Sequence, residues 1–279
     1  MRKYLILIVI FWSVSISVVA QGEIDEQKRV MFRDESSYGG FLNSNGFSLN
    51  YRYGFWRNAR NQFILDGDFS YVKHAKEVKT NVAVDYSTRR YIFGKQNLFW
   101  ELKGMAGWQK ELFRKQDKTG ISVRLFYSGG LSIGFLKPIY YEVYTFPTTI
   151  GEPLEMEYMK FDPAIHLTPY NIGGRGPFFM GFDELKVVPG LTAKTGLSFE
   201  YSQKDAIIHA LEAGMSLTLY PKEIPIMATE QNRFLFFNVI VGYRFGRIVD
   251  ISEAARAKSR KERRKERKSQ GSSLPYPMF

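Results

Sequence analysis

Apolar and polar residues alternate along residues 190–220, in two arms separated by a few polar residues around Gln203, Lys204 and Asp205. Successive side chains of a strand point to opposite faces, so each arm has one apolar and one polar face. In the first arm the apolar face carries Leu191, Ala193, Leu197, Phe199 and Tyr201, and in the second Ile207, Leu211, Ala213, Met215, Leu217 and Leu219. Both arms exceed the roughly five or six residues of a typical soluble strand and are long enough for a tilted bilayer crossing. The stretch therefore predicts a membrane β-hairpin.

The same alternation recurs elsewhere and predicts further strands at residues 40–56, 62–73, 90–113, 120–135, 139–146 and 233–246. The segment 90–113 is either one very long strand or two shorter strands broken near residues 94–97. Counting it once gives eight strands, and ten remain an alternative. A chain that crosses a membrane with strands must close them into a barrel, because lipid cannot satisfy open strand edges. We therefore expect an all-β, transmembrane, antiparallel up-and-down β-barrel with a basic C-terminal tail.

Charged residues fall on the polar faces of these strands, and two carboxylates facing lipid from a single strand would be very costly. The charged residues that we expect to face the interior are Arg52, Asp66, Asp68, Glu101, Lys103, Arg124, Lys194, Glu200 and Glu212. In a wide barrel these residues would line a channel. The interior of an eight-stranded barrel is only wide enough for its own side chains, so a closed network of ion pairs is the favoured interpretation.

Loop lengths indicate an orientation if both chain ends lie in the periplasm. Lys137-Pro138 and the residues 203–205 are then tight inner turns, and the long segments 147–186 and 221–232 lie outside. Short inner turns and long outer loops are typical of outer-membrane barrels. Two exceptions remain: 57–61 is short for an outer loop, and 74–89 is long for an inner one.

The ends of the chain predict export and a separate tail. Residues 1–20 have Arg2 and Lys3, a largely apolar run and a Val18-Val19-Ala20 cleavage site, which favours a secretory signal over a membrane-anchor helix. Residues 21–39 are predicted to be a polar lead-in, 40–246 the barrel, and 247–279 a periplasmic tail. The chain has no cysteine, so disulfides and a lipid-modified amino terminus are excluded.

The net charge of +11 belongs mostly to the tail. Residues 247–268 hold ten Lys or Arg against four acidic residues, a net of +6, and the signal contributes +2, which leaves +3 for the body. The basic tail residues are Arg256, Lys258, Arg260, Lys261, Arg263, Arg264, Lys265, Arg267 and Lys268. The tail is either solvated and partly disordered or a helix that contacts anionic head groups or an acidic periplasmic partner. Nucleic-acid binding fits this charge but not the compartment, so we expect no nucleic-acid partner.

Several short stretches resemble a poorly characterised family of outer-membrane β-barrel proteins from Bacteroidota-type bacteria. They are residues 39–47, 73–77, 93–95, 136–143, Tyr220-Pro221-Lys222 and 224–227, and the resemblance spans about residues 35–246. The sequence departs from the family pattern at Ala75, where the family is expected to have proline after the histidine. The resemblance implies architecture and an outer-membrane location, with no established reaction.

Small outer-membrane barrels include lipid-modifying enzymes, which need a histidine beside a serine and a carboxylate. His166, with Asp162 before it and Thr168 after it, is the histidine best placed in the long outer loop. His74 and His209 are predicted near inner turns, and no Gly-x-Ser-x-Gly elbow accompanies His166. No pair of histidines has a metal-ligand spacing. The glycines around Arg175 could approach an anionic group, although a flexible loop tip is the simpler interpretation. No catalytic, cofactor or metal residue is therefore predicted.

These observations predict an outer-membrane barrel in contact with outer-membrane lipid, with a structural or accessory role in an envelope assembly. Its long outer loop and basic tail would contact envelope protein partners. The alternatives are a small pore or transporter and a lipid-modifying enzyme.

Overall fold

The computed structural model describes residues 34–58, 60–80, 90–115, 120–145, 155–164, 172–202, 207–228 and 231–249. The signal, residues 250–279 of the basic tail, His166 and the turn at 203–205, all predicted above, lie outside these ranges, while residues 247–249 of the predicted tail belong to the last strand. Among the described residues, no helix is long and apolar enough to span a membrane.

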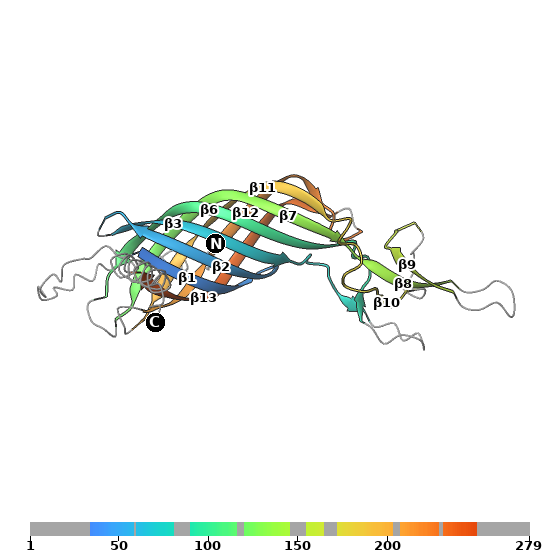
Figure 1. The fold of residues 1–279 in the computed structure, drawn as a ribbon, viewed down its shortest axis with the longest axis horizontal. Coiled ribbons are helices and arrows are strands. Elements are labelled where there is room, and N and C mark those ends of the chain that lie inside the picture. Colours follow the sequence, from blue (N-terminus) through green and yellow to red (C-terminus); the bar gives the residue numbers. More distant parts are fainter. Residues whose placement is uncertain are drawn as a thin grey trace, which may run out of the picture. The chain divides into compact units, whose positions relative to one another are not determined.

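Eight strands form one closed barrel (Figure 1). In chain order they are β1 (Asp34–Asn43), β2 (Gly46–Trp56), β3 (Asn61–Val72), β6 (Asn97–Phe113), β7 (Ser122–Pro138), β11 (Lys186–Glu200), β12 (Ile207–Ile224) and β13 (Arg233–Val249). Each barrel strand is antiparallel to the next, and β1 pairs with β13 from Asp34↔Val249 to Asn43↔Ile240. The predicted all-β, antiparallel up-and-down barrel of eight strands is confirmed.

The hairpin predicted at 190–220 is formed by β11 and β12, paired from Leu191↔Leu219 to Glu200↔Ala210. The two faces follow the predicted alternation. Leu191 and Leu211 lie on the outer wall with 58% and 53% of their surface exposed, while Lys194 and Glu212 are buried inside. Burial of the polar face inside and exposure of the apolar face outside is the reverse of a water-soluble barrel.

The predicted first strand at 40–56 is wrong, because it is two strands. Ser44 and Asn45 form a two-residue turn, and β1 and β2 pair across it from Asn43↔Gly46. The turn composition of Asn43-Ser44-Asn45-Gly46 was the signal for this break. β1 begins at Asp34, so the last residues of the predicted lead-in are part of the barrel, which runs from 34 to 249.

The prediction of a barrel strand at 139–146 is also wrong. The division of 40–56 adds one barrel strand and the loss of 139–146 removes one, so the total of eight is unchanged. β8 (Tyr140–Thr145) pairs with β9 (Glu155–Lys160) and β10 (Ile172–Arg175) in a separate three-stranded sheet. The segment 147–186, expected to be irregular, therefore contains two strands of this sheet. A further hairpin pairs β4 (Lys79–Thr80) with β5 (Tyr91–Ile92), and the chain breaks at residues 93–96 before β6, as the two-strand alternative for 90–113 requires.

Correcting these strands changes the side on which several connections lie. One end of the barrel carries the connections 44–45, 73–96, 139–185 and 225–232, and the other carries 57–60, 114–121 and 201–206 together with the start of β1 and the end of β13. The predictions of Lys137-Pro138 as an inner turn, of 74–89 as an inner loop and of 57–61 as an outer loop are therefore wrong. The connections 57–60, 114–121 and 201–206 share the end at which the barrel strands begin and finish, so both exceptions noted in the sequence disappear. The two-residue turn 44–45 lies at the opposite end, beside the three long connections. We call the opposite end the long-loop end.

Candidate functional site: the barrel interior

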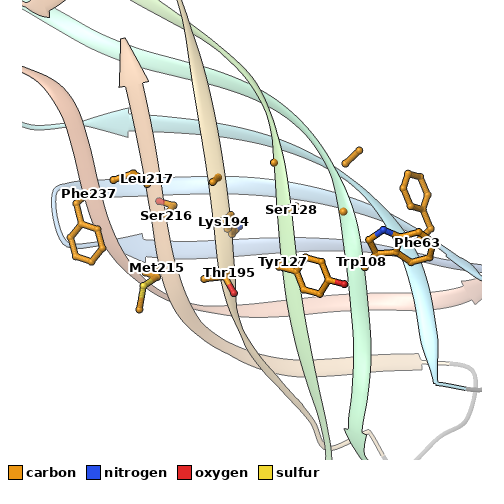
Figure 2. Close-up of a pocket in the computed structure, with 14 residues that line it drawn as sticks. Phe63, Trp108, Tyr127, Ser128, Lys194, Thr195, Met215, Ser216, Leu217 and Phe237 are labelled. Atoms are coloured by element: carbon orange, nitrogen blue, oxygen red, sulfur yellow. The ribbon is translucent and has the colours of Figure 1, made fainter.

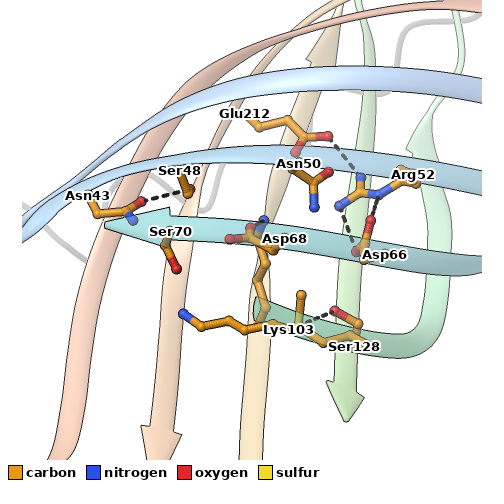
Figure 3. Close-up of polar contacts among 12 residues, drawn as sticks. Asn43, Ser48, Asn50, Arg52, Asp66, Asp68, Ser70, Lys103, Ser128 and Glu212 are labelled. Carbon is orange, nitrogen blue, oxygen red and sulfur yellow. Dashed lines mark hydrogen bonds and ion pairs between the residues drawn. The ribbon is translucent and has the colours of Figure 1, made fainter. Parts of the chain in front are cut away.

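Two arginines and their side-chain acceptors form a buried network in the lumen. Figure 3 shows the part of it around Arg52, with Asp66 and Glu212. Arg52 on β2 donates to both carboxylate oxygens of Asp66 on β3, from Nε at 2.7 Å and from Nη2 at 3.2 Å. Its Nη1 reaches Glu212 on β12 at 2.9 Å. Arg244 on β13 donates to the same Glu212 at 2.8 and 3.1 Å and to Asn50 at 2.6 Å. The network therefore joins both sides of the barrel wall across its interior.

A second group of buried ion pairs lies on β3, β6, β11 and β12. Lys103 pairs with Glu101 at 2.7 Å, and Glu101 also accepts hydrogen bonds from Ser70 at 3.2 Å and from the Tyr220 hydroxyl at 2.9 Å. Lys194 pairs with Asp68 at 3.4 Å. Each carboxylate has a cation or several donors, as buried charges require.

A third network lies nearer the end with short connections. Arg124 donates to Glu35 at 2.9 Å, and its Nη2 lies 2.7 Å from Glu200 Oε2 without hydrogen-bond geometry. Lys115 pairs with Glu200 at 2.9 Å and donates to the Ser202 carbonyl at 2.8 Å.

All nine charged residues predicted to face the interior lie inside the barrel, and each has an ion-pair partner there. Three partners were missed: Glu35, Lys115 and Arg244. Arg244 lies on the polar face of the last strand and could have been found from the alternation, whereas Glu35 was assigned to the lead-in and Lys115 lies just beyond a strand. With these additions the ion pairs of the three networks join six cations, Arg52, Lys103, Lys115, Arg124, Lys194 and Arg244, to six carboxylates, Glu35, Asp66, Asp68, Glu101, Glu200 and Glu212.

Side chains fill the space around these networks. The Arg52 guanidinium lies over the Phe126 ring at 4.6 Å, and the Lys194 ammonium lies over the Phe41 ring at 4.5 Å. A cavity between Asp68, Lys103 and Lys194 measures about 10 Å³, roughly the room of a single water molecule.

An apolar cluster fills the lumen at the long-loop end. Phe99, Tyr220 and Phe236 point inward from three strands with ring centroids 5.5 to 5.9 Å apart. Ile224 at the end of β12, and Ile226 and Met227 from the connection between β12 and β13, pack on them. The N–H groups of Gln96 and Asn97 donate to the Ile226 carbonyl, and Ala228 N–H donates to the carbonyl of Gly94, whose φ of 76° requires glycine. These backbone bonds hold the connection across the barrel mouth.

The outer wall has aromatic rings near both ends and smaller apolar residues between them. Along the β3–β6 pair, Tyr71↔Trp100 lies near the long-loop end and Phe63↔Trp108 lies eight residues further along β3. Eight residues span about 26 Å of strand, or roughly 20 Å along the axis of a barrel with strands tilted by about 40°. Aromatic girdles bordering an apolar band of about 25 Å are typical of barrels in the outer membrane.

A shallow groove runs over the same wall, where Ala106, Gly107, Gly129 and Ala193 give little side-chain volume. Its cavity volume is about 550 Å³, and Figure 2 shows the rings of Phe63, Trp108, Tyr127 and Phe237 beside it. Small residues between large rings leave a hollow that is apolar and open to the outside of the barrel.

The two described histidines lie away from the charged networks. The ring of His74 contacts the Gln231 carbonyl at 3.4 Å and the Lys76 N–H at 3.2 Å. His209 lies on the outer wall, where its Nδ1 is 2.5 Å from the Tyr243 hydroxyl. In the described part of the chain, no group of three or more histidine or acidic side chains is placed to hold a metal ion.

Comparison with known proteins gives similarities to solved structures alone. No family model matches the chain, and no curated protein matches it. Neisserial surface protein A matches with 12% identity, 77% coverage of this chain, 96% of its own and a TM-score of 0.37. Ail, the attachment invasion locus protein of Yersinia pestis, crystallised with the heparin analogue sucrose octasulfate, matches with 13% identity, 78% and 99% coverage and a TM-score of 0.35. The N-terminal β-barrel domain of Pseudomonas aeruginosa OprF matches with 8% identity, 77% and 98% coverage and a TM-score of 0.34. The fold itself is established by the closed strand order.

Proposed function

We propose that this chain is an outer-membrane β-barrel protein with a closed lumen and a structural or accessory role in a cell-envelope assembly. The observation that carries the proposal is the pairing of buried charges inside a wall whose outer face is apolar. A charged interior is compatible with a membrane only if the barrel is closed and its outer face meets lipid, and both conditions fit this structure.

A closed lumen favours a structural role over a pore. The ion pairs cross the interior, and the apolar cluster fills the mouth, so no continuous path for hydrated ions is provided by the described residues. The proposal therefore predicts that the purified chain, inserted into planar bilayers, gives no single-channel current. Stable conductance steps would overturn the closed lumen and favour the small pore or transporter.

Membrane residence has its own test. The chain is expected to remain with the outer-membrane fraction after alkaline extraction and to require detergent for release. A compact monomer that is soluble in water without detergent would overturn the proposal, because the exposed apolar wall could not stay hydrated.

Contacts with partners are expected through the outer connections and the basic tail. The experiment is co-purification in mild detergent of the full chain and of a chain that ends at Val249, where β13 finishes. Loss of specific envelope proteins from the shortened chain would support the role of the tail. Identical partner sets would remove that role, and the absence of any partner would remove the assembly role.

A further inference from the structure

A cleft of about 370 Å³ lies outside the lumen at the long-loop end, between the end of β3, the β4–β5 hairpin and the three-stranded sheet. Its volume is within the range of roughly 300–1,000 Å³ that is usual for small-ligand sites. The cleft is backed by an apolar cluster that includes Tyr91, Ile139 and Tyr141, so its shape is held by packing within the protein.

The charged residues that line the cleft are mostly cationic: Lys73, Lys79, Arg90, Lys95 and Arg175 face one carboxylate, Glu77. Lys95 and Glu77 neutralise each other in a buried ion pair of 2.7 Å. Among the described residues, the other four cations have no carboxylate within ion-pairing distance. Within the described part of the chain, the lining therefore offers four cations without a paired carboxylate, whereas each lumen cation named above is paired with one.

Arg175 has an unused donor. Its Nη2 atom is buried and has no hydrogen-bond partner, although its guanidinium lies 5.6 Å from the centroid of the Phe178 ring. A buried donor without an acceptor is unfavourable, and an anionic ligand would supply the acceptor. The residue is not at a flexible loop tip, as the sequence favoured, because Ile172–Arg175 forms β10 and its glycines are buried against β8.

Tyr91 and Tyr141 of the cleft are neutral at physiological pH and do not repel an anion. Tyr141 donates its hydroxyl hydrogen to the carbonyls of Ile92 at 2.8 Å and Lys95 at 2.6 Å. Burial raises the pKa of Tyr141 well above its ordinary range and raises the pKa of Tyr91 to about 12. The two hydrogen bonds of Tyr141 also fix the turn that carries Lys95.

We propose that this cleft is a binding site for a phosphate-bearing ligand, with Arg175 as the central contact and Lys73, Lys79 and Arg90 at its rim. Several cations suit a multiply charged group better than a single carboxylate, and the planar guanidinium fork matches phosphate oxygens. Such a group can belong to the head of a membrane glycolipid or to a soluble phosphate compound.

The test uses the full chain in non-ionic detergent and two probes that separate these sources. One probe is inorganic pyrophosphate, and the other is lipid A, a diphosphorylated glycolipid, in mixed micelles compared with zwitterionic phosphatidylcholine. Binding is measured by isothermal titration calorimetry for the native chain, Arg175→Gln, the double variant Lys79→Gln/Arg90→Gln, and Lys222→Gln. Lys222 is an exposed cation of β12 that does not line the cleft.

We expect saturable binding that is weakened about tenfold or more by Arg175→Gln and by the double variant, and changed by less than about twofold by Lys222→Gln. Tighter binding of lipid A identifies a lipid head group, and equal or tighter binding of pyrophosphate identifies a soluble ligand. Lys79 and Arg90 are exposed, so the double variant tests the site even if Arg175→Gln disturbs the sheet. Failure of both probes to saturate, or an equal loss with Lys222→Gln, would overturn the proposal. The pyrophosphate titration also remains informative if the protein proves not to reside in a membrane.

Discussion

At the scale of single residues, Glu212 is the group on which the central network depends most. Its carboxylate is shared by Arg52 and Arg244, and the side chains of all three are almost completely buried. We predict that Glu212→Gln lowers the free energy of unfolding by about 3–5 kcal/mol, because two guanidinium groups would lose their shared counterion. Urea titration of the folded barrel in detergent micelles, followed by tryptophan fluorescence, measures this change.

The matched control for this variant is Glu157→Gln, since Glu157 is an exposed residue of β9. It is expected to change the free energy of unfolding by less than about 0.5 kcal/mol. If Glu212→Gln has no larger effect than the control, the two arginines do not depend on this carboxylate.

Outside the barrel strands, Glu184 provides a pH-dependent contact. Lys160 and the Tyr140 hydroxyl donate to its two carboxylate oxygens, and these bonds, that of Lys160 first, hold the pKa of Glu184 below its ordinary value. A lowered pKa means that the contact stabilises the folded sheet at neutral pH and is lost as the pH falls through the folded-state pKa. The contact is exposed, so its contribution to stability is expected to be small.

Carboxyl-carbon NMR of labelled Glu184 tests this assignment. We predict a titration midpoint below the ordinary value in the native chain and a higher midpoint in Lys160→Met. Lys222→Met, which removes a cation elsewhere, should leave the midpoint unchanged. An ordinary midpoint in the native chain would contradict the prediction.

At the scale of elements, β10 is positioned by a close approach of Gly173 to Tyr144 of β8. A side-chain carbon at Gly173 would overlap the Tyr144 ring. We predict that Gly173→Val separates β10 from β8, at a cost of about 1–3 kcal/mol for overpacking, and leaves the eight barrel strands intact. Limited proteolysis should then cut within residues 140–185 sooner than in the native chain, while the barrel fragments stay protected.

Gly67→Ala is the matched control, because nothing lies within 4 Å of the added carbon there. Its digestion pattern should equal that of the native chain. If Gly173→Val is also digested like the native chain, β10 is not held by this contact.

The elements also show how far the sequence could predict this molecule. Alternation identified the inward and outward faces of β2, β3, β6, β7, β11 and β12. In such a strand a shift of one residue would move every charged side chain to the apolar outer face, so the pattern is strict. It did not show which strands share a sheet: the aromatic residues of β8 alternate as a barrel strand would, yet they pack against β9 and β10. The cleft was not predictable either, since its cations come from four separate segments and meet only because the connections fold back together.

At the scale of the whole molecule, the barrel depends on the seam between β1 and β13. A chain that lacks residues 34–43 would leave β2 and β13 with open edges, which lipid cannot satisfy. We predict that this deletion, with residues 1–33 retained, gives no folded barrel, measured as loss of heat-modifiable mobility in electrophoresis and of protease resistance. A chain that ends at Val249 keeps the full seam and should fold like the native protein. A folded barrel without residues 34–43 would show that β2 can replace β1 at the seam.

The seam has a kinetic consequence as well. It joins Asp34 to Val249, residues separated by 215 positions (249 minus 34), so the first and last strands must find each other after the rest of the chain has been made. Contacts between such distant positions slow folding, and until they form the unpaired edges are prone to aggregate. The barrel therefore closes only after β13 has been made, and until then the open edges of β1 and β13 are exposed to pairing with other chains.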